Sequence, residues 1–149
     1  MTLFFFISGA SGFIGNRLLN AVDGQIRVLS RAKLLNYDTV VCDFGKKVIP
    51  KESLNGVDTV LHLAGFAHDM RDESKAVDLY YKVNVDATVQ LAGLAVKAGV
   101  KRFVFVSSVK AGGSPDFEAC SSENDQADPE GVYGKTKREA ELKLLKIGK

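Results

Sequence analysis

The sequence has no tryptophan, and only two cysteines and three prolines occur among its 149 residues. Cys42 and Cys120 lie far apart and lack a CxxC or Cys/His spacing, which argues against a disulfide framework or a zinc site. His62 lies in an apolar run and His68 stands alone, so neither has a metal-binding companion. We therefore expect reduced thiols, a cytoplasmic protein and no bound metal.

Charge of one sign and long apolar runs are also missing. The net charge is +2, and the twenty basic residues are dispersed, which argues against nucleic acid or a membrane surface as a partner. The apolar stretch 3–7 is too short to span a membrane and has no preceding basic residues, unlike a signal peptide. A hydrophobic content of 46% is enough for a core, and the length favours one domain over 1–149.

Short apolar runs alternate with segments of helical periodicity along the chain. Bounded, β-branched or continuously apolar runs predict strands at 3–7, 26–30, 39–42, 57–63 and 103–107. Apolar spacing predicts helices over 13–24, 72–98 and 131–147, the second ending at Gly99 and the third carrying an exposed Glu139–Lys143 pair. The stretch 112–129 is rich in Gly, Ser, Asp and Pro, and predicts a long functional loop.

This alternation predicts an α/β fold, a Rossmann-type doubly wound parallel sheet with helices on both faces, because β-α-β crossovers are right-handed. Ligands of such sheets bind at the carboxyl ends of the strands. The candidate site therefore lies just after Ile7, Ser30, Cys42, Leu63 and Val106.

Three glycines stand between the first predicted strand and the first predicted helix. In residues 8–15, Gly9 can make the tight turn, Gly12 lets the backbone approach a pyrophosphate, and Gly15 allows close helix-to-strand packing. The helix N-terminus would add N–H groups for the anion. The alternative is an ordinary glycine-containing turn, but the flanking strand and helix favour a phosphate loop.

The GxxGxxG spacing and its surroundings resemble the extended branch of the short-chain dehydrogenase/reductases, which includes NAD(P)-dependent nucleotide-sugar epimerases and dehydratases. Four further segments carry this resemblance: His62-Leu63-Ala64-Gly65, Asn84-Val85-Asp86-Ala87-Thr88, Phe105-Val106-Ser107-Ser108 and Tyr133-Gly134-Lys135-Thr136-Lys137. The last matches the family's YxxxK signature.

The YxxxK pair places Tyr133 and Lys137 on one helix face. A nearby ammonium favours phenolate over phenol, which would make Tyr133 usable as an acid or base. A Tyr and a Lys at this spacing are often only exposed surface residues. Here, however, the position of the pair after the fifth predicted strand favours a catalytic role. The resemblance implies Ser108 as the third catalytic residue, with Ser107 as a structural hydroxyl at the strand end.

The resemblance also implies which residues contact an NAD or NADP cofactor. Asp43 would contact the adenine, or else cap a turn. Arg31, with Lys33 nearby, stands where NAD-binding relatives have a carboxylate. A guanidinium there suits the 2′-phosphate of NADP and so favours NADP over NAD; the alternative is an exposed arginine without a role in binding. The remaining predicted contacts are Gly9, Ser11, Gly12, Phe13, Ile14, Gly15, Leu63, Ala64, Gly65, Asn84, Tyr133 and Lys137.

The resemblance leaves three functions open: a nucleotide-sugar epimerase or dehydratase, a non-catalytic dinucleotide-binding module, and an NADP-dependent carbonyl reductase. Only twelve residues follow Lys137, so we expect the substrate-binding subdomain to be absent and the chain to be a fragment or a degenerate descendant of an enzyme. Family members typically pair through two long helices, here 72–98 and 131–147. Small residues such as Ala87 and Ala140 would permit that close packing.

Overall fold

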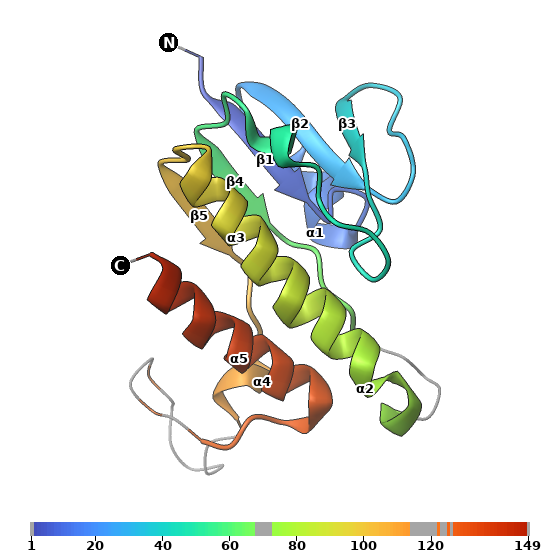
Figure 1. Cartoon of the computed structure of the whole chain (residues 1–149), viewed down its shortest axis with the longest axis vertical. Helices are drawn as coiled ribbons and strands as arrows, with labels where there is room; N and C mark the ends of the chain where they lie inside the picture. Colours follow the sequence, from blue (N-terminus) through green and yellow to red (C-terminus); the bar gives the residue numbers. More distant parts are fainter. Residues whose placement is uncertain (1, 68–72, 114–121, 123–124, 126, 149) are drawn as a thin grey trace.

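The computed structural model describes residues 2–67, 73–113, 122, 125 and 127–148, and these form one five-stranded sheet (Figure 1). All neighbouring strands pair in parallel, in the order β3-β2-β1-β4-β5. The strands are β1 (Phe4–Ser8), β2 (Gln25–Ser30), β3 (Asp38–Val41), β4 (Thr59–His62) and β5 (Arg102–Phe105). The predicted parallel α/β sheet is confirmed.

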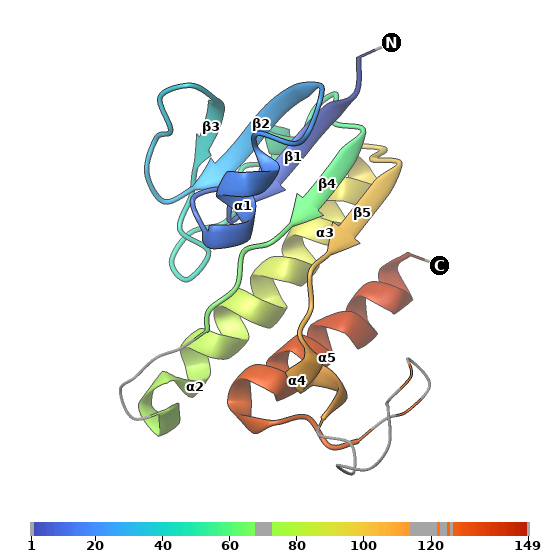
Figure 2. The same ribbon diagram turned by 180° about the vertical axis from the view of Figure 1, so that it is seen from behind.

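Helices cover both faces of the sheet. Helix α1 lies on one face, and α3 and α5 lie on the other, as Figures 1 and 2 show from opposite sides. The doubly wound arrangement is therefore confirmed. The helical elements are α1 (Phe13–Leu18), the 3₁₀ turn η1 (Lys51–Leu54), α2 (Glu73–Tyr81), the π-helical turn η2 (Lys82–Asp86), α3 (Ala87–Lys97), α4 (Val109–Gly112) and α5 (Gly131–Ile147).

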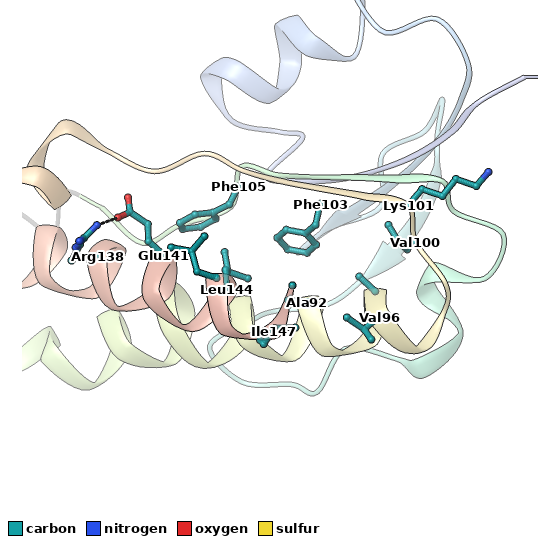
Figure 3. Close-up of a pocket in the computed structure, with 13 residues that line it drawn as sticks. Ala92, Val96, Val100, Lys101, Phe103, Phe105, Arg138, Glu141, Leu144 and Ile147 are labelled. Atoms are coloured by element: carbon teal, nitrogen blue, oxygen red, sulfur yellow. Dashed lines mark hydrogen bonds and ion pairs between the residues drawn. The ribbon is translucent and has the colours of Figure 1, made fainter. Parts of the chain in front are cut away.

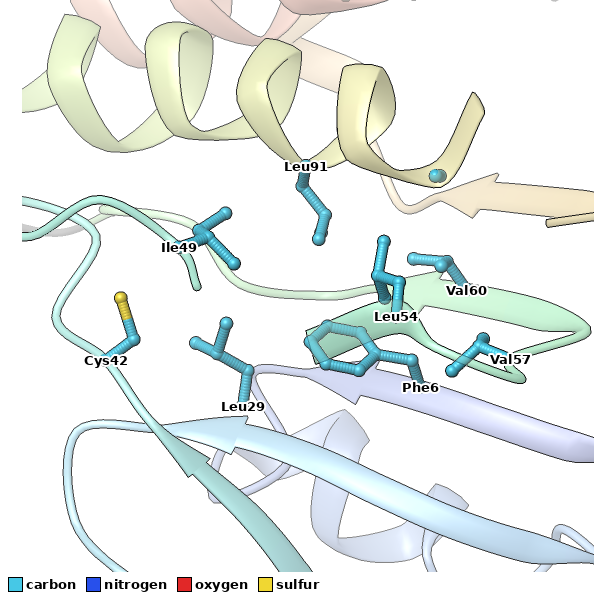
Figure 4. Packing of buried hydrophobic residues seen from close by; sticks show 9 residues of the cluster. Phe6, Leu29, Cys42, Ile49, Leu54, Val57, Val60 and Leu91 are labelled. Atoms are coloured by element: carbon cyan, nitrogen blue, oxygen red, sulfur yellow. The ribbon is translucent and has the colours of Figure 1, made fainter. Parts of the chain in front are cut away.

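The sheet is buried on both sides because successive side chains point to opposite faces. Phe6 of β1 joins Leu29, Val60 and Leu91 in a cluster beneath α3 (Figure 4). The next residue, Ile7, packs in a second cluster on the α1 side of the sheet. This two-sided burial explains why the first strand is continuously apolar rather than alternating.

Helix α1 is shorter than predicted and ends at Leu18 rather than near Gly24. Beyond Leu18 the chain tightens, because Asn20 N–H donates to the Arg17 carbonyl at 3.2 Å and Ala21 N–H to the Leu18 carbonyl at 3.0 Å. These are i to i−3 bonds, which close the helix in a tighter turn. Strand β4 is also shorter than 57–63, and just before it the carboxylate of Asp58 accepts the Phe4 N–H at 3.0 Å.

The predicted long helix is interrupted by η2, which the sequence pattern did not reveal. Asp72, where the helix was predicted to start, and His68 lie outside the described residues, and the described helix starts at Glu73. Its end is as predicted, because Gly99 follows the cap residue Ala98 with a positive φ of 71°.

Strand β5 ends at Phe105 rather than at residue 107, and a short helix that was not predicted, α4, lies between it and the predicted loop 112–129, sharing only Gly112 with that loop. Ser108 ends the extended segment by capping this helix, its Oγ accepting the Lys110 N–H at 3.3 Å. Cys120 and the rest of the predicted loop at 114–121, 123–124 and 126 lie outside the described residues. Helix α5 covers the predicted range 131–147, and its Glu139–Lys143 ion pair measures 3.0 Å.

The small residues assigned to a dimer contact are used within the chain. Ala140 is fully buried and Ala87 is 5% exposed, in the region where α3 and η2 pack against α5. Their size therefore allows helices of one chain to approach each other, and the predicted pairing of two copies stays a prediction. None of the described helices is long and apolar enough to cross a membrane.

Candidate active site

The glycine loop after β1 is pressed against the end of β4. Gly9 has a φ of +73°, and a Cβ built on it would lie 2.7 Å from the Ala64 nitrogen. A Cβ on Gly15 would overlap the Gly9 carbonyl oxygen, so α1 packs directly on the turn. The roles predicted from the sequence for Gly9, the tight turn, and Gly15, close packing, agree with this geometry.

The start of α1 offers a surface for an anion. Gly12 is the N-cap residue and has no side chain with which to satisfy the first N–H groups of the helix. Ser11 is exposed, as are Phe13 at 77% and Ile14 at 53%. The Arg17 guanidinium lies over the Phe13 ring, 3.9 Å from its centroid, and adds positive charge to this surface.

The end of β4 is fixed by a buried polar network around His62. Its Nδ1 lies 2.5 Å from Ser8 Oγ, and its Nε2 lies 2.8 Å from Thr88 Oγ1. Ser8 Oγ also accepts the Ala64 N–H at 3.3 Å, so the ends of β1 and β4 share one hydroxyl. Burial, and secondarily the charge of Lys137, lower the pKa of His62 to about 3, so the imidazole is neutral. His62, which lies in an apolar run of the sequence, is thus a core histidine, and its hydrogen bonds give it a structural role that the sequence did not show.

Asn84 lies in η2 and is 1% exposed. Its Oδ1 accepts the Phe66 N–H at 2.7 Å, and its Nδ2 donates to the Phe66 carbonyl at 3.0 Å and to Thr136 Oγ1 at 3.1 Å. The amide therefore ties the segment after β4 to helix α5. A π-helical turn at such a position is common near functional sites.

Lys137 is buried, with 3% of its surface exposed, and reaches back to the end of β5. Its Nζ donates to the Val106 carbonyl at 2.7 Å and lies 4.0 Å from the centroid of the Phe105 ring. Burial lowers the pKa of this ammonium to about 8, although the Glu141 carboxylate opposes the shift. A Cβ on Gly65 would stand 4.0 Å from Nζ, so Lys137 also adjoins the segment after β4.

Tyr133 and Ser108, both half-buried, belong to elements that pack together. Ser108 caps α4, and the Lys110 carbonyl of α4 accepts the Glu130 N–H at 2.9 Å, immediately before α5 begins. Tyr133 lies in the first turn of α5, one turn before Lys137. The predicted catalytic residues therefore belong to the region where the segment after β5 runs down into α4 beside the start of α5 (Figure 2).

Arg31 and Asp43 lie at the carboxyl ends of β2 and β3, on the opposite side of the sheet from β5. Arg31 follows β2 and is exposed, as is Lys33. Asp43 follows β3, and its Oδ1 accepts the Gly45 N–H at 3.1 Å while its Oδ2 lies 3.8 Å from Lys46 Nζ. The turn-capping alternative for Asp43 is thus seen directly, and the adenine contact stays a prediction. Nearby Cys42 is buried, which raises the pKa of its thiol.

The predicted residues in the loops follow the carboxyl ends of the strands, and Asn84 and Lys137 reach the segments after β4 and β5 from their helices, but several partners were not predicted. Ser8, Thr88 and Thr136 are buried hydroxyls that hold the network together. Their signal was weak, because a single hydroxyl in an apolar segment is ordinary. The Ser107–Glu141 pair, 34 positions apart, was also missed.

Comparison with known proteins agrees with this geometry. A sequence profile described as the NAD dependent epimerase/dehydratase family matches residues 5–149. The chain belongs to this family. It is 33% identical over 153 residues to a UDP-glucose 4-epimerase of Vibrio cholerae, covering 96% of this chain and 46% of that relative. It is 37% identical over 141 residues to an N-acetyl-alpha-D-glucosaminyl-diphospho-ditrans,octacis-undecaprenol 4-epimerase of Escherichia coli O157:H7, covering 89% and 40%.

Solved structures show the same fold. MoeE5 in complex with UDP-glucose and NAD superposes with a TM-score of 0.83 at 30% identity, over 96% of this chain and 48% of that one. The dTDP-glucose 4,6-dehydratase DesIV from Streptomyces venezuelae, with NAD and TYD bound, gives a TM-score of 0.81 at 25% identity, over 95% and 50%. The chain spans about half the length of these proteins, and the family resemblance inferred from its motifs is confirmed.

Proposed function

We propose that the chain binds NAD along the carboxyl ends of its strands and contributes Tyr133, Lys137 and Ser108 to a nucleotide-sugar epimerase or dehydratase reaction. The observation that carries this proposal is a continuous line of contacts. Gly9 touches Ala64, Gly65 adjoins both Asn84 and Lys137, and Lys137 holds the end of β5.

The residues fit a dinucleotide at this edge. The diphosphate would lie at the cap of α1, where Gly12 leaves space and the helix N-terminus favours an anion. The Lys137 ammonium has three donors and, within the described part of the chain, uses one on the Val106 carbonyl. The others can hold a ribose hydroxyl. The NAD and the UDP-glucose bound by MoeE5 support the choice of cofactor and of substrate class.

In this proposal NAD, when bound, supplies a reversible hydride acceptor. Tyr133 takes the proton from the reacting sugar hydroxyl, and Ser108 hydrogen-bonds that oxygen. Lys137 stabilises the Tyr133 phenolate from one turn away on α5. The Phe105 ring beside Nζ keeps water from that side of the ammonium.

Substitution at Gly12 tests the diphosphate position. Gly12 has extended backbone angles, and a Cβ there would approach only the Gly9 carbonyl, at 3.2 Å. Gly12→Asp caps α1 but places a negative charge against the diphosphate, so we expect helix stability to be kept and NAD affinity to fall at least about tenfold by titration calorimetry. Gly12→Ser, which caps without charge but also places a side chain in that space, should weaken NAD binding less than Gly12→Asp, and the difference between the two variants reports the effect of the charge. Unchanged affinity in Gly12→Asp would contradict this binding mode.

Tyr133→Phe separates chemistry from binding. We expect NAD affinity within about twofold of wild type, because the hydroxyl acts on the substrate, and complete loss of any turnover with UDP-glucose. A large loss of NAD affinity would contradict the assigned role. NAD binding by wild type without turnover would support a dinucleotide-binding module, and net consumption of NADPH with a carbonyl compound would support a reductase.

A preference for NADP over NAD would depend on Arg31, and it is tested by comparing the affinities of the two cofactors. If the guanidinium binds a 2′-phosphate, wild type binds NADP more tightly than NAD, and Arg31→Ala weakens NADP binding alone. Equal loss for both cofactors, or no loss, would remove this preference.

A further inference from the structure

Helix α5 is joined to the end of β5 by two neighbouring polar contacts. Lys137 donates to the Val106 carbonyl at 2.7 Å, and Glu141, one turn later, accepts a hydrogen bond from the hydroxyl of Ser107. Two residues of one helix face thus hold two consecutive residues of the chain. The next residue, Ser108, begins α4.

Both oxygens of the Glu141 carboxylate are engaged. Oε1 accepts from Ser107, and Oε2 accepts from Arg138 Nη1 at 3.0 Å, an interaction drawn in Figure 3. Glu141 and Arg138 are about three-quarters buried, at 25% and 29% exposure of their side chains. Charge-assisted hydrogen bonds of this kind are the stronger ones, and they fix the carboxylate in place.

Beyond this contact, α5 is not packed tightly on the sheet. A cavity of about 730 Å³ lies between α3, β5 and the second half of α5, lined by apolar side chains including Phe103, Leu144 and Ile147 (Figure 3). Glu141 and Arg138 lie at the polar end of this cavity, near Phe105. The hydrogen bonds of Lys137 and Glu141 therefore join α5 to the end of β5 beside the region where the cavity separates the helix from the sheet.

We propose that Glu141 is a positioning residue that, through Ser107, locks α5 to the end of β5 and thereby sets where the Lys137 ammonium and the Tyr133 phenol lie. This rests on the function proposed above for Lys137 and Tyr133. It also gives Ser107 a role distinct from that of Ser108: its hydroxyl is committed to Glu141.

The charges around Lys137 also connect it to Glu141. Glu141 on α5 is the acidic group that raises the pKa of Lys137 against the effect of burial. His62 of β4 faces the same region and is neutral, Arg138 and Tyr133 share α5, and Lys110 of the packed helix α4 is exposed. Removing the Glu141 charge therefore lowers the pKa of the Lys137 ammonium further and favours the neutral amine.

The test follows Lys137 directly by NMR titration of protein labelled with ¹³C at lysine Cε, with the signal assigned through Lys137→Met. We expect Glu141→Gln to lower the Lys137 titration midpoint by about half a pH unit. The matched control is Glu139→Gln, which removes a carboxylate of an exposed ion pair on the same helix and leaves the midpoint unchanged. An unchanged midpoint in Glu141→Gln would overturn the proposal.

Ser107 variants give a second test that does not remove a charge. Ser107→Ala should weaken NAD binding several-fold, and Ser107→Thr, which keeps the hydroxyl, should restore it. Wild type without NAD affinity would refute the proposed function and leave the titration to decide the positioning role. NAD binding by wild type and equally by Ser107→Ala would refute the positioning role alone.

Discussion

The buried ammonium of Lys137 makes the stability of the protein depend on pH in a defined direction. Its pKa falls from 10.5 to about 8 on folding, because burial removes the charge from water. One pKa unit corresponds to about 1.4 kcal/mol, so the charged form costs the folded state about 3 kcal/mol. Below pH 8 both folded and unfolded chains hold the proton, and the cost is fully present. As pH rises from 8 toward 10.5 the folded protein releases its proton first, and the cost is relieved.

Lys137→Met exposes this dependence, because methionine keeps the unbranched apolar chain and has no proton to release. We expect the free energy of unfolding of wild type, relative to Lys137→Met, to rise by about 2.5 kcal/mol between pH 7 and pH 10. With a urea m-value of about 2 kcal/mol/M, the difference between the two midpoints should change by roughly 1 M. Groups that titrate in both proteins cancel in this comparison.

The matched control is Lys135→Met, which removes an exposed lysine from the same helix and leaves the wild-type pH dependence in place. The reasoning would be refuted by the same stability difference between wild type and Lys137→Met at pH 7 and pH 10. Lys137→Met also loses the hydrogen bond to Val106, worth about 1 kcal/mol, which lowers its stability equally at both pH values.

Three further outcomes follow from the structure. His62→Gln should lose less stability in acid than wild type. The unfolded histidine takes up a proton below pH 6.5 and the folded one only near pH 3, so the free energy of unfolding of wild type falls by about 2 kcal/mol between pH 7 and pH 5. Equal losses for the two proteins in urea melts would contradict this. Gly15→Ala should destabilise the fold by about 1–3 kcal/mol in the same assay, because its methyl overlaps the Gly9 carbonyl, and a neutral effect would refute that packing. Gly93→Ala, with nothing within 4 Å of the added methyl inside α3, should instead stabilise by about 0.5–1 kcal/mol, and a loss of stability would be the contrary result.

The sheet and the glycine loop were predictable because their signals are local. A continuously apolar run followed directly by glycines, as at Phe6 and Gly9, restricts the backbone to a buried strand and a tight turn. The Tyr133–Lys137 pair likewise needs only the helical repeat to place both residues on one face. These features require no knowledge of distant partners.

The features that were missed depend on pairing across the chain. The apolar positions around Asn84 fit a continuous helix, and nothing in them distinguishes a π-helical turn. Helix α4 has four residues, too few for a periodic signal. The carboxylate at Glu141, four positions beyond Lys137, was the available hint of an anchor, but its partner Ser107 became recognisable only once β5 and α5 were side by side.

The π-helical turn between α2 and α3 also bears on how this chain should be aligned with its relatives. Such a turn accommodates one residue more than an α-helical turn, so deletion of one residue within Lys82–Asp86 would convert it to an ordinary α-helical turn and change the direction of the side chains only within the turn. Asn84 would then swing away from Phe66, while the apolar face of α3 stayed on the sheet. Sequence comparisons through this stretch should therefore admit a single-residue gap, and homologues that lack the extra residue are expected to carry a different group in place of the asparagine.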